Sequence, residues 1–298
     1  MLTLVTGASG QLGRSIKSLV KLQNISNSFV FATRDQLDLS YLNDIQSYFK
    51  DRKFDLIINC AAYTKVDKAE LDEKQANLIN HLAVKKIAEI AQSNNIKLIH
   101  ISTDFVFDGF KSQPYIESDA TDPLNIYGKT KLAGENAVIS IMKFNAIIIR
   151  TSWVYSEYGN NFVDTILKLV KNGNELNVVS DQIGTPTYAS DLGLAILNII
   201  RSEKFNRNGQ ESQIYHYSNK GFCNWHDFAK EIIKILGTNC ILNSIKTENY
   251  LTTAKRPRST VMSTDKISKE FGVKINFWKD SLNVCMKNLS VISVSNEN

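Results

Sequence analysis

The chain is predicted to be an α/β protein with a doubly wound parallel sheet and a smaller C-terminal α/β substrate domain. Three observations predict this. Short apolar strands alternate with amphipathic helices from residue 2 to residue 155, which is typical of parallel sheets with right-handed crossovers. A glycine-rich turn follows the first strand, and small hydroxylated residues follow a later one. The alternation breaks after residue 155, which indicates that a second unit begins near there.

The composition excludes several classes of protein. Of 298 residues, 43% are hydrophobic and 22% are charged, as in soluble globular proteins, and no apolar run is long enough to span a membrane. The first residues lead directly into a strand and do not resemble a signal peptide, so we expect a cytoplasmic protein without a membrane partner. The formal net charge of +5 comes from interspersed basic and acidic residues. This pattern argues against a nucleic acid partner and is compatible with an anionic substrate.

Cysteines and histidines are scattered and lack the spacing of a metal site or a disulfide framework, so we expect free thiols and no metal. They are Cys60, Cys223, Cys240, Cys285, His81, His100, His216 and His226.

The first strand, residues 2–5, runs into a turn with glycines at 7, 10 and 13, and a helix is predicted to begin near Arg14. Glycines at this spacing allow a tight turn, a close approach of the backbone to a pyrophosphate, and close packing of helix on strand. The context of strand, turn and helix predicts a dinucleotide site of the Rossmann type. Its predicted contacts here are Gly7, Ser9, Gly10, Gln11, Leu12 and Gly13.

The second strand, residues 29–32, ends beside Arg34, and a helix is predicted over 41–52. An arginine at this strand end can meet the 2′-phosphate of NADP, whereas an acidic residue would favour NAD. Arg34 therefore favours NADPH, with NADH possible because Asp35 is adjacent. The alternative is a solvent-exposed loop arginine. Asp38 and Leu39, which follow, are also predicted to contact the cofactor.

The third strand, residues 55–62, ends in small residues that let a cofactor lie over the backbone, and Ala61, Ala62 and Tyr63 are the predicted contacts. Residues 63–70 are predicted to form a polar loop on the ligand side of the sheet. The helix predicted over 75–93 has apolar residues at helical spacing and is mostly structural.

The fourth strand, residues 97–101, delivers Thr103 to the edge of the sheet where open α/β sheets bind ligands. A later helix starts at Tyr127, and Lys131 lies one turn on, so both side chains share a face. An ammonium beside a phenol lowers the phenol pKa and makes it a usable proton donor. Tyr-x-x-x-Lys alone is a common coincidence, so the prediction rests on its combination with the hydroxylated strand end and the glycine-rich turn.

Beyond a fifth strand at 146–150, Trp153 is predicted either to pack in the core or to stack on the sugar or base of a ligand. Helices are predicted over 160–172, 188–200, 225–236 and 277–289, and residues 214–217 are predicted to return as a strand to the first sheet. Residues 174–187 and 241–257 are predicted to be loop-rich or irregular. The resulting domains are 1–185 for the dinucleotide, with returning segments near 188–218, then 219–290 for the substrate and a tail at 291–298.

Several motifs together resemble the extended short-chain dehydrogenase/reductase family, with a match over residues 1 to about 285. Besides the glycine-rich turn and Tyr127-x-x-x-Lys131, the similar stretches are 62–70, 102–109, 127–135, 150–155 and 181–187. The sequence departs from the family pattern at Phe105, where tyrosine is usual, and at Lys65, where a small residue is usual. Any polar role of the ring at 105 therefore does not carry over, and the role of Lys65 stays open.

The resemblance implies an NAD(P)H-dependent reduction of the 4-keto group of dTDP-4-dehydro-6-deoxy-L-mannose to dTDP-L-rhamnose, a precursor of surface polysaccharide, by a monomer or homodimer. The implied catalytic residues are Tyr127, Lys131 and Thr103, of which Tyr127 and Lys131 would also contact the cofactor. The implied substrate contacts are Thr64, Val66, Thr103, Asp104, Phe105, Trp153, Gln182 and Arg256. Arg256 would clamp the diphosphate, for which a guanidinium is suited, or would lie in a solvated turn.

Two rival functions share these motifs. One is a reductase, epimerase or dehydratase that acts on another nucleotide sugar and differs only in the substrate loops at 62–70, 181–187 and 254–258. The other is a regulatory subunit that binds the cofactor without turnover, although the presence of Tyr127, Lys131 and Thr103 argues against it.

Overall fold

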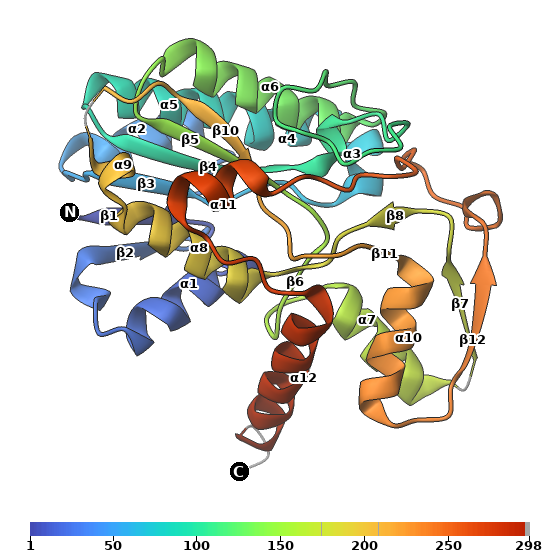
Figure 1. Cartoon of the computed structure of the whole chain (residues 1–298). Helices are drawn as coiled ribbons and strands as arrows, with labels where there is room; N and C mark the ends of the chain where they lie inside the picture. Colours follow the sequence, from blue (N-terminus) through green and yellow to red (C-terminus); the bar gives the residue numbers. More distant parts are fainter. Residues whose placement is uncertain (174, 208, 296–298) are drawn as a thin grey trace.

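A six-stranded parallel sheet forms the centre of the protein, in the strand order β10-β5-β4-β3-β1-β2 (Figure 1). The structure is a computed structural model that describes residues 1–173, 175–207 and 209–295. The doubly wound parallel sheet predicted from the sequence is confirmed, including the return of β10 to pair with β5.

The strands of this sheet are β1 (Thr3–Thr6), β2 (Phe29–Ala32), β3 (Leu56–Asn59), β4 (Lys97–Thr103), β5 (Ala146–Thr151) and β10 (Gln213–His216). The shorter strands outside it are β6 (Val154–Tyr155), β7 (Glu175–Val179), β8 (Ile183–Gly184), β9 (Thr187–Tyr188), β11 (Cys223–Asn224) and β12 (Ile241–Ile245). The helices up to residue 172 are α1 (Gln11–Leu22), α2 (Leu42–Lys50), α3 (Val66–Leu71), α4 (Glu73–Asn77), α5 (Ala83–Ser93), α6 (Ile126–Ile141) and α7 (Phe162–Asn172). Those that follow are α8 (Ala189–Arg201), α9 (Glu203–Asn206), α10 (Trp225–Leu236), α11 (Asp265–Phe271) and α12 (Trp278–Ser295). A π-helical turn, η2 (Leu78–Leu82), joins α4 to α5, and short 3₁₀ turns are η1 (Ser26–Ser28), η3 (Asp104–Val106) and η4 (Thr247–Asn249).

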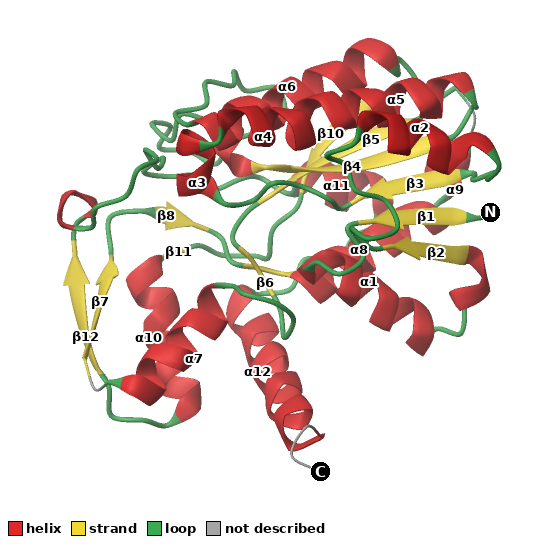
Figure 2. Cartoon of the chain, turned by 180° about the vertical axis from the view of Figure 1, so that it is seen from behind, coloured by secondary structure: helices red, strands yellow, loops and turns green. Residues whose placement is uncertain are grey.

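Helices cover both faces of the sheet (Figure 2). Helices α2, α5 and α6 lie on one face and bury alternate strand residues such as Leu4, Ile57 and Ile148. Helices α1, α8 and α11 lie on the other face and bury the intervening strand residues, such as Val5 and Ile58. Because successive side chains of a strand point to opposite faces, strands buried on both sides must be apolar throughout, as β3 and β5 largely are.

The chain reverses its winding direction between β1 and β3. From β1 it moves outward to β2, then returns to β3 and continues to β4 and β5 on the other side. Open α/β sheets bind ligands outside the carboxyl ends of the strands at such a switch point. The glycine-rich turn after β1 lies there, beside the end of β3.

A smaller unit lies beside the carboxyl ends of the sheet and has its own apolar core. Helices α7, α10 and α12 contribute to this core, and β7 pairs with β12 along its edge. Because α7 and β7 pack here, we propose that this unit comprises about 154–184 together with 219–250 and α12. The boundary predicted at residue 185 would instead have assigned α7 and β7 to the dinucleotide domain.

The structure differs from the sequence-based expectations at several places. Residues 66–71 form helix α3 instead of a loop, with Ala69 buried. The passages predicted to be loop-rich or irregular contain β7, β8, β9 and β12, which are paired strands too short or too polar to recognise by periodicity. Helix α11 was not predicted. Helix α12 continues to Ser295 into the predicted tail, of which residues 296–298 lie outside the described residues.

Within the described parts of the chain, no helix combines the length and the apolar character needed to cross a bilayer.

Candidate active site

The glycine-rich turn forms a cradle that only glycine can build. Gly7 has a positive φ of 65°, and a Cβ there would lie 2.7 Å from the backbone nitrogen of Ala61. A Cβ on Gly13 would lie 2.5 Å from the carbonyl oxygen of Gly7. The N-cap of α1 is Gly10, which has no side chain to bind the first N–H groups of the helix. These N–H groups and the positive end of the helix dipole fit a pyrophosphate, so the turn suits a dinucleotide.

The remaining residues of the turn have different surroundings. Leu12 is buried in the core, so its contribution to a cofactor would come from its backbone. The Gln11 side chain turns away toward the smaller unit, where its Oε1 accepts hydrogen bonds from Ser156 and Asn161, both at 3.0 Å. Gln11 therefore ties the cofactor turn to the loop after β6.

At the end of β2, the Arg34 side chain is 69% exposed and its Nε donates to the Asp38 carboxylate at 3.0 Å. An exposed guanidinium held by one carboxylate still has donors available for a phosphate. Leu39, also predicted to contact the cofactor, is buried in the core beneath this loop. Its side chain is part of the core, so a contact with the cofactor would come from its backbone.

At the end of β3, an asparagine that was not predicted fixes the backbone of Tyr63. Asn80, buried in the π-helical turn η2, accepts from the Tyr63 nitrogen at 2.9 Å and donates to its carbonyl oxygen at 3.0 Å. Its Nδ2 also donates to Thr130 on α6 at 3.2 Å. Asn80 was not among the predicted site residues. Its place in a π-helical turn supports a functional role, because such turns often mark functional positions. It joins the segment of Ala61, Ala62 and Tyr63 to the helix that carries Tyr127.

The predicted catalytic hydroxyls lie together at the carboxyl end of β4. The Thr103 hydroxyl donates to the buried Asp104 carboxylate at 3.0 Å and also hydrogen-bonds Tyr127, which lies in the first turn of α6. Burial of its hydroxyl raises the pKa of Tyr127 to about 12, against the hydrogen bond with Thr103, which lowers it. A phenol with this pKa is protonated at neutral pH and can act as a proton donor.

Asp104 is fully enclosed, and burial raises its pKa to about 6 despite hydrogen bonds from Thr260 and Thr103. Both carboxylate oxygens are thus occupied by hydroxyl groups. Its negative charge also raises the pKa of Tyr127. Asp104 therefore supports the reacting hydroxyls and joins them to the segment that contains Thr260.

Lys131 is buried beside these groups, and its Nζ donates to the Ile101 carbonyl oxygen at 2.6 Å. Burial lowers the pKa of Lys131 to about 8, against the carboxylate of Glu135 and the thiol of Cys60, which raise it. From the spacing on one helix face, Lys131 is expected to lower the pKa of Tyr127. In this arrangement burial governs the pKa of Tyr127 instead, because the ammonium is directed at the end of β4.

A row of buried polar side chains that was not predicted leads to Lys131. The Thr6 hydroxyl donates to the Asn59 side chain at 2.6 Å, Asn59 donates to His100 Nδ1 at 3.1 Å, and His100 Nε2 lies 3.5 Å from Lys131 Nζ. Parallel pairing aligns Thr6 with Asn59 and Asn59 with His100. Burial holds the pKa of His100 well below its usual value, so the ring is neutral. The signal for this row was present in the sequence, since polar residues within otherwise apolar buried strands are informative.

Next to these groups, a cleft opens toward the smaller unit. It is lined by Phe105, Trp153, Gln182, Ile183, Trp225, Arg256, Pro257 and Thr260. Four of the predicted substrate residues line it, namely Phe105, Trp153, Gln182 and Arg256. Thr64 and Val66 lie instead at the start of α3, whose Asp67 bonds Arg256.

Two tryptophans from distant parts of the chain stack in this cleft. The rings of Trp153 and Trp225 lie 3.5 Å apart and nearly parallel, at 9°. Trp153 has a positive φ of 45°, and a Cβ on Gly184 would lie 2.6 Å from its ring, so the backbone and Gly184 together place it. Trp225 Nε1 donates to Gln182 Oε1 at 3.2 Å. Trp225 was not among the predicted site residues, because it opens a helix in another unit.

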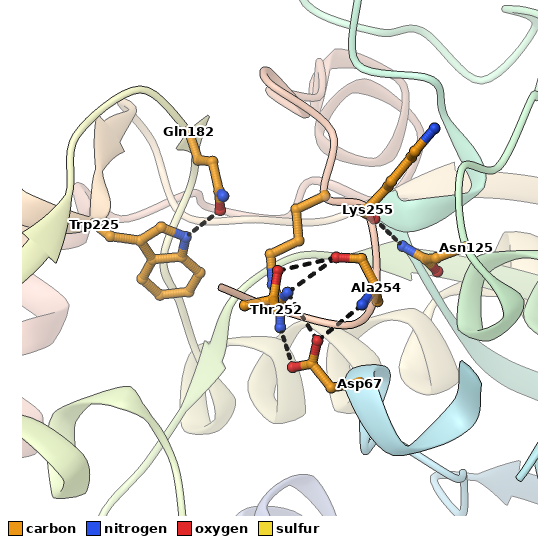
Figure 3. A network of polar contacts seen from close by, with 8 residues as sticks. Asp67, Asn125, Gln182, Trp225, Thr252, Ala254 and Lys255 are labelled. Atoms are coloured by element: carbon orange, nitrogen blue, oxygen red, sulfur yellow. Dashed lines mark hydrogen bonds and ion pairs between the residues drawn. The ribbon is translucent and has the colours of Figure 1, made fainter. Parts of the chain in front are cut away.

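The predicted phosphate clamp, Arg256, is paired within the protein. Its Nη2 lies 2.5 Å from Asp67 Oδ2. The other carboxylate oxygen of Asp67 accepts from the Ala254 nitrogen at 3.1 Å (Figure 3). The Arg256 side chain is 21% exposed and the Asp67 side chain 44%. The solvated turn considered as the alternative does not describe this arginine. Its contact with Asp67 joins residues near 254–256 to α3.

Comparisons with known proteins agree with this geometry. The family model described as RmlD substrate binding domain matches residues 1–291. The dTDP-4-dehydrorhamnose reductase of Aggregatibacter actinomycetemcomitans is 39% identical over 285 residues, which cover 94% of this chain and 96% of the relative.

Two solved structures are also similar. A dTDP-4-dehydrorhamnose reductase from Clostridium acetobutylicum is 37% identical with a TM-score of 0.90, and the match covers 97% of this chain and all of that one. The dTDP-4-dehydrorhamnose reductase of Bacillus anthracis, solved in complex with NADP, is 33% identical with a TM-score of 0.89 and the same coverage. A family model that spans nearly the whole chain, together with relatives of this identity and coverage, establishes that the chain belongs to the dTDP-4-dehydrorhamnose reductase (RmlD) family.

Proposed function

We propose that this protein reduces the 4-keto group of dTDP-4-dehydro-6-deoxy-L-mannose to the alcohol of dTDP-L-rhamnose, with NADPH as the reductant. The observation that carries the proposal is the convergence of Thr103 and Tyr127 at the carboxyl end of β4, between the glycine cradle and the cleft with the two tryptophans. The cradle would hold the pyrophosphate, and Arg34 would favour the 2′-phosphate of NADPH.

The chain's own residues would complete the reduction. NADPH, when bound, supplies the hydride that adds to C4 of the sugar. As the carbonyl oxygen gains negative charge, Tyr127 gives it a proton. Thr103 donates a hydrogen bond to the same oxygen once its single hydroxyl proton turns away from Asp104. The product then carries a hydroxyl at C4, and Tyr127 is left as a phenolate. A proton from solvent then restores the phenol, while the Lys131 ammonium holds the end of β4 through the Ile101 carbonyl oxygen and would contact the bound cofactor.

The direct test follows the loss of NADPH absorbance with dTDP-4-dehydro-6-deoxy-L-mannose generated in place from dTDP-glucose by the upstream enzymes. Oxidation of NADPH that depends on the sugar nucleotide, with dTDP-L-rhamnose as the product, supports the proposal. Tight cofactor binding without oxidation would identify a regulatory subunit. Oxidation only with another nucleotide sugar would identify a sister enzyme.

The pKa of Lys131 sets an expected pH dependence. The mechanism needs the ammonium form, and burial lowers the pKa of Lys131 to about 8. The active form is therefore present below pH 8 and is lost as the pH rises through it, so kcat should fall by roughly tenfold per pH unit at higher pH. The measurement is kcat at saturating substrates between pH 6 and pH 10. A kcat that stays constant to pH 10 would contradict this role of Lys131.

Trp225 is expected to contribute to binding of the sugar nucleotide. Replacing Trp225 by Leu removes the stack that supports Trp153 and the hydrogen bond to Gln182. Aromatic pairs contribute about 0.5–1.5 kcal/mol beyond area, so KM for the sugar nucleotide should rise up to roughly tenfold with little change in kcat. The control is Phe222→Leu, an aromatic residue that is 65% exposed. Equal KM values in the two variants would show that the stack is only structural.

A further inference from the structure

The segment 252–260, which we call the strap, crosses the candidate site and contributes Arg256, Pro257 and Thr260 to the cleft. It is fastened on one side by Asp67 of α3 and by Asp104 after β4. On the other side, the Ile183 nitrogen donates to the Arg258 carbonyl oxygen at 2.7 Å. The strap is therefore a wall of the substrate cleft whose position depends on both units.

One buried asparagine joins the strap to the helix that carries Tyr127. Asn125 Nδ2 donates to the Lys255 carbonyl oxygen at 2.8 Å, which Figure 3 shows beside the Asp67 contacts. Its Oδ1 accepts from the Gly128 nitrogen, also at 2.8 Å, and so caps the start of α6. The two partners fix the orientation of the amide, because an N–H can only donate and a carbonyl can only accept. Asn125 is 2% exposed, so water does not compete for either hydrogen bond.

The start of α6 is held by contacts with neighbouring elements. The Ile126 nitrogen donates to Glu70 Oε1 at 2.8 Å, so the N–H groups on both sides of Tyr127 have side-chain acceptors. A Cβ on Gly128 would lie 2.2 Å from the Phe105 carbonyl oxygen, so the helix start is seated directly on the end of β4. A shift of Asn125 would thus move both Tyr127 and the strap.

We propose that Asn125 is a positioning residue that couples the position of the strap to the placement of Tyr127. The proposal rests on the proposed function, since it deepens the description of the same site. Helix α3 provides the parallel link, because Asp67 binds the strap while Glu70 binds the start of α6. Through these two links, the position of the strap and the position of Tyr127 depend on each other.

The test removes the hydrogen bond from Asn125 to the strap and keeps its cap of α6. In Asn125→Asp, one side-chain oxygen still caps α6, but the donor to the Lys255 carbonyl is replaced by an acceptor. We expect KM for the sugar nucleotide to rise several-fold and kcat to fall, while the dissociation constant of NADPH is unchanged. Asn125→Ser, which keeps a capping oxygen but lacks the amide NH2 group that reaches the Lys255 carbonyl, should show the same changes. Asn224→Asp is the matched control, since Asn224 caps α10 in the same way at a partly exposed position.

A second readout does not depend on activity. Lys255 and Arg258 are exposed on the strap, so a loosened strap becomes a better trypsin substrate. We expect cleavage after Lys255 and Arg258 to be several-fold faster in Asn125→Asp than in the wild type or Asn224→Asp, with unchanged circular dichroism. Wild-type cleavage rates and wild-type KM in Asn125→Asp would overturn the inference. Faster cleavage with unchanged KM and kcat would overturn the coupling.

These outcomes are distinct from failure of the proposed function. If the wild-type protein does not oxidise NADPH with the dTDP-sugar, the proposed substrate is wrong, whatever the variants do. If the wild type is active and Asn125→Asp matches it in both readouts, only the role of Asn125 is wrong.

Discussion

Replacing Tyr127 by Phe is expected to lower kcat by about 10²–10⁴-fold, the usual contribution of a positioned general acid. The ring remains, so its edge-to-face contact with Phe105 at 5.8 Å and the packing of α6 should persist. What is lost is the hydroxyl that hydrogen-bonds Thr103 and would protonate the oxygen at C4. The measurement is single-turnover and steady-state oxidation of NADPH with the dTDP-sugar.

Cofactor binding provides the control for this variant. Because the glycine cradle lies on a different element, the dissociation constant of NADPH, measured by fluorescence, should change by less than about threefold. Tyr41→Phe, at a tyrosine that is 61% exposed, should leave kcat unaltered. Turnover by Tyr127→Phe within about tenfold of the wild-type rate would remove Tyr127 from the role of acid.

Replacing Glu135 by Leu is expected to destabilise the protein by about 3–5 kcal/mol, because it leaves a buried arginine without its counter-charge. Glu135 on α6 and Arg150 on β5 are 2% and 3% exposed, and their closest atoms are 2.7 Å apart. Arg150 Nε also donates to both carboxylate oxygens, at 3.0 and 3.1 Å. The measurement is the free energy of unfolding from urea titration.

A surface ion pair on a helix of the same layer provides the comparison. Glu89 and Lys86 are 4.0 Å apart and 44% and 31% exposed, so Glu89→Leu should change the free energy of unfolding by less than about 1 kcal/mol. Restoring neutrality with Glu135→Leu and Arg150→Met together should recover part of the lost stability. A loss below about 1 kcal/mol in Glu135→Leu would mean that water reaches Arg150 and solvates it.

The sequence alone determined the elements of the sheet and the type of cofactor turn. Glycines at 7, 10 and 13 after a strand indicate a tight turn close to other backbone, and a Cβ at Gly7 or Gly13 would indeed meet backbone atoms. Tyr127 and Lys131 lie on one face of α6 because helical periodicity is local. Strands β1 to β5 and β10 could be recognised because each contains a short run of apolar residues.

Only the tertiary structure decided which distant residues meet. Strand register aligned Thr6, Asn59 and His100, and no local pattern encodes register between strands. The stack of Trp153 on Trp225 and the pairing of Arg256 with Asp67 join positions that are 72 and 189 residues apart. These contacts depend on how the two units pack. That packing, through burial, also sets the pKa of Tyr127 near 12 and that of Lys131 near 8, which spacing along a helix could not predict.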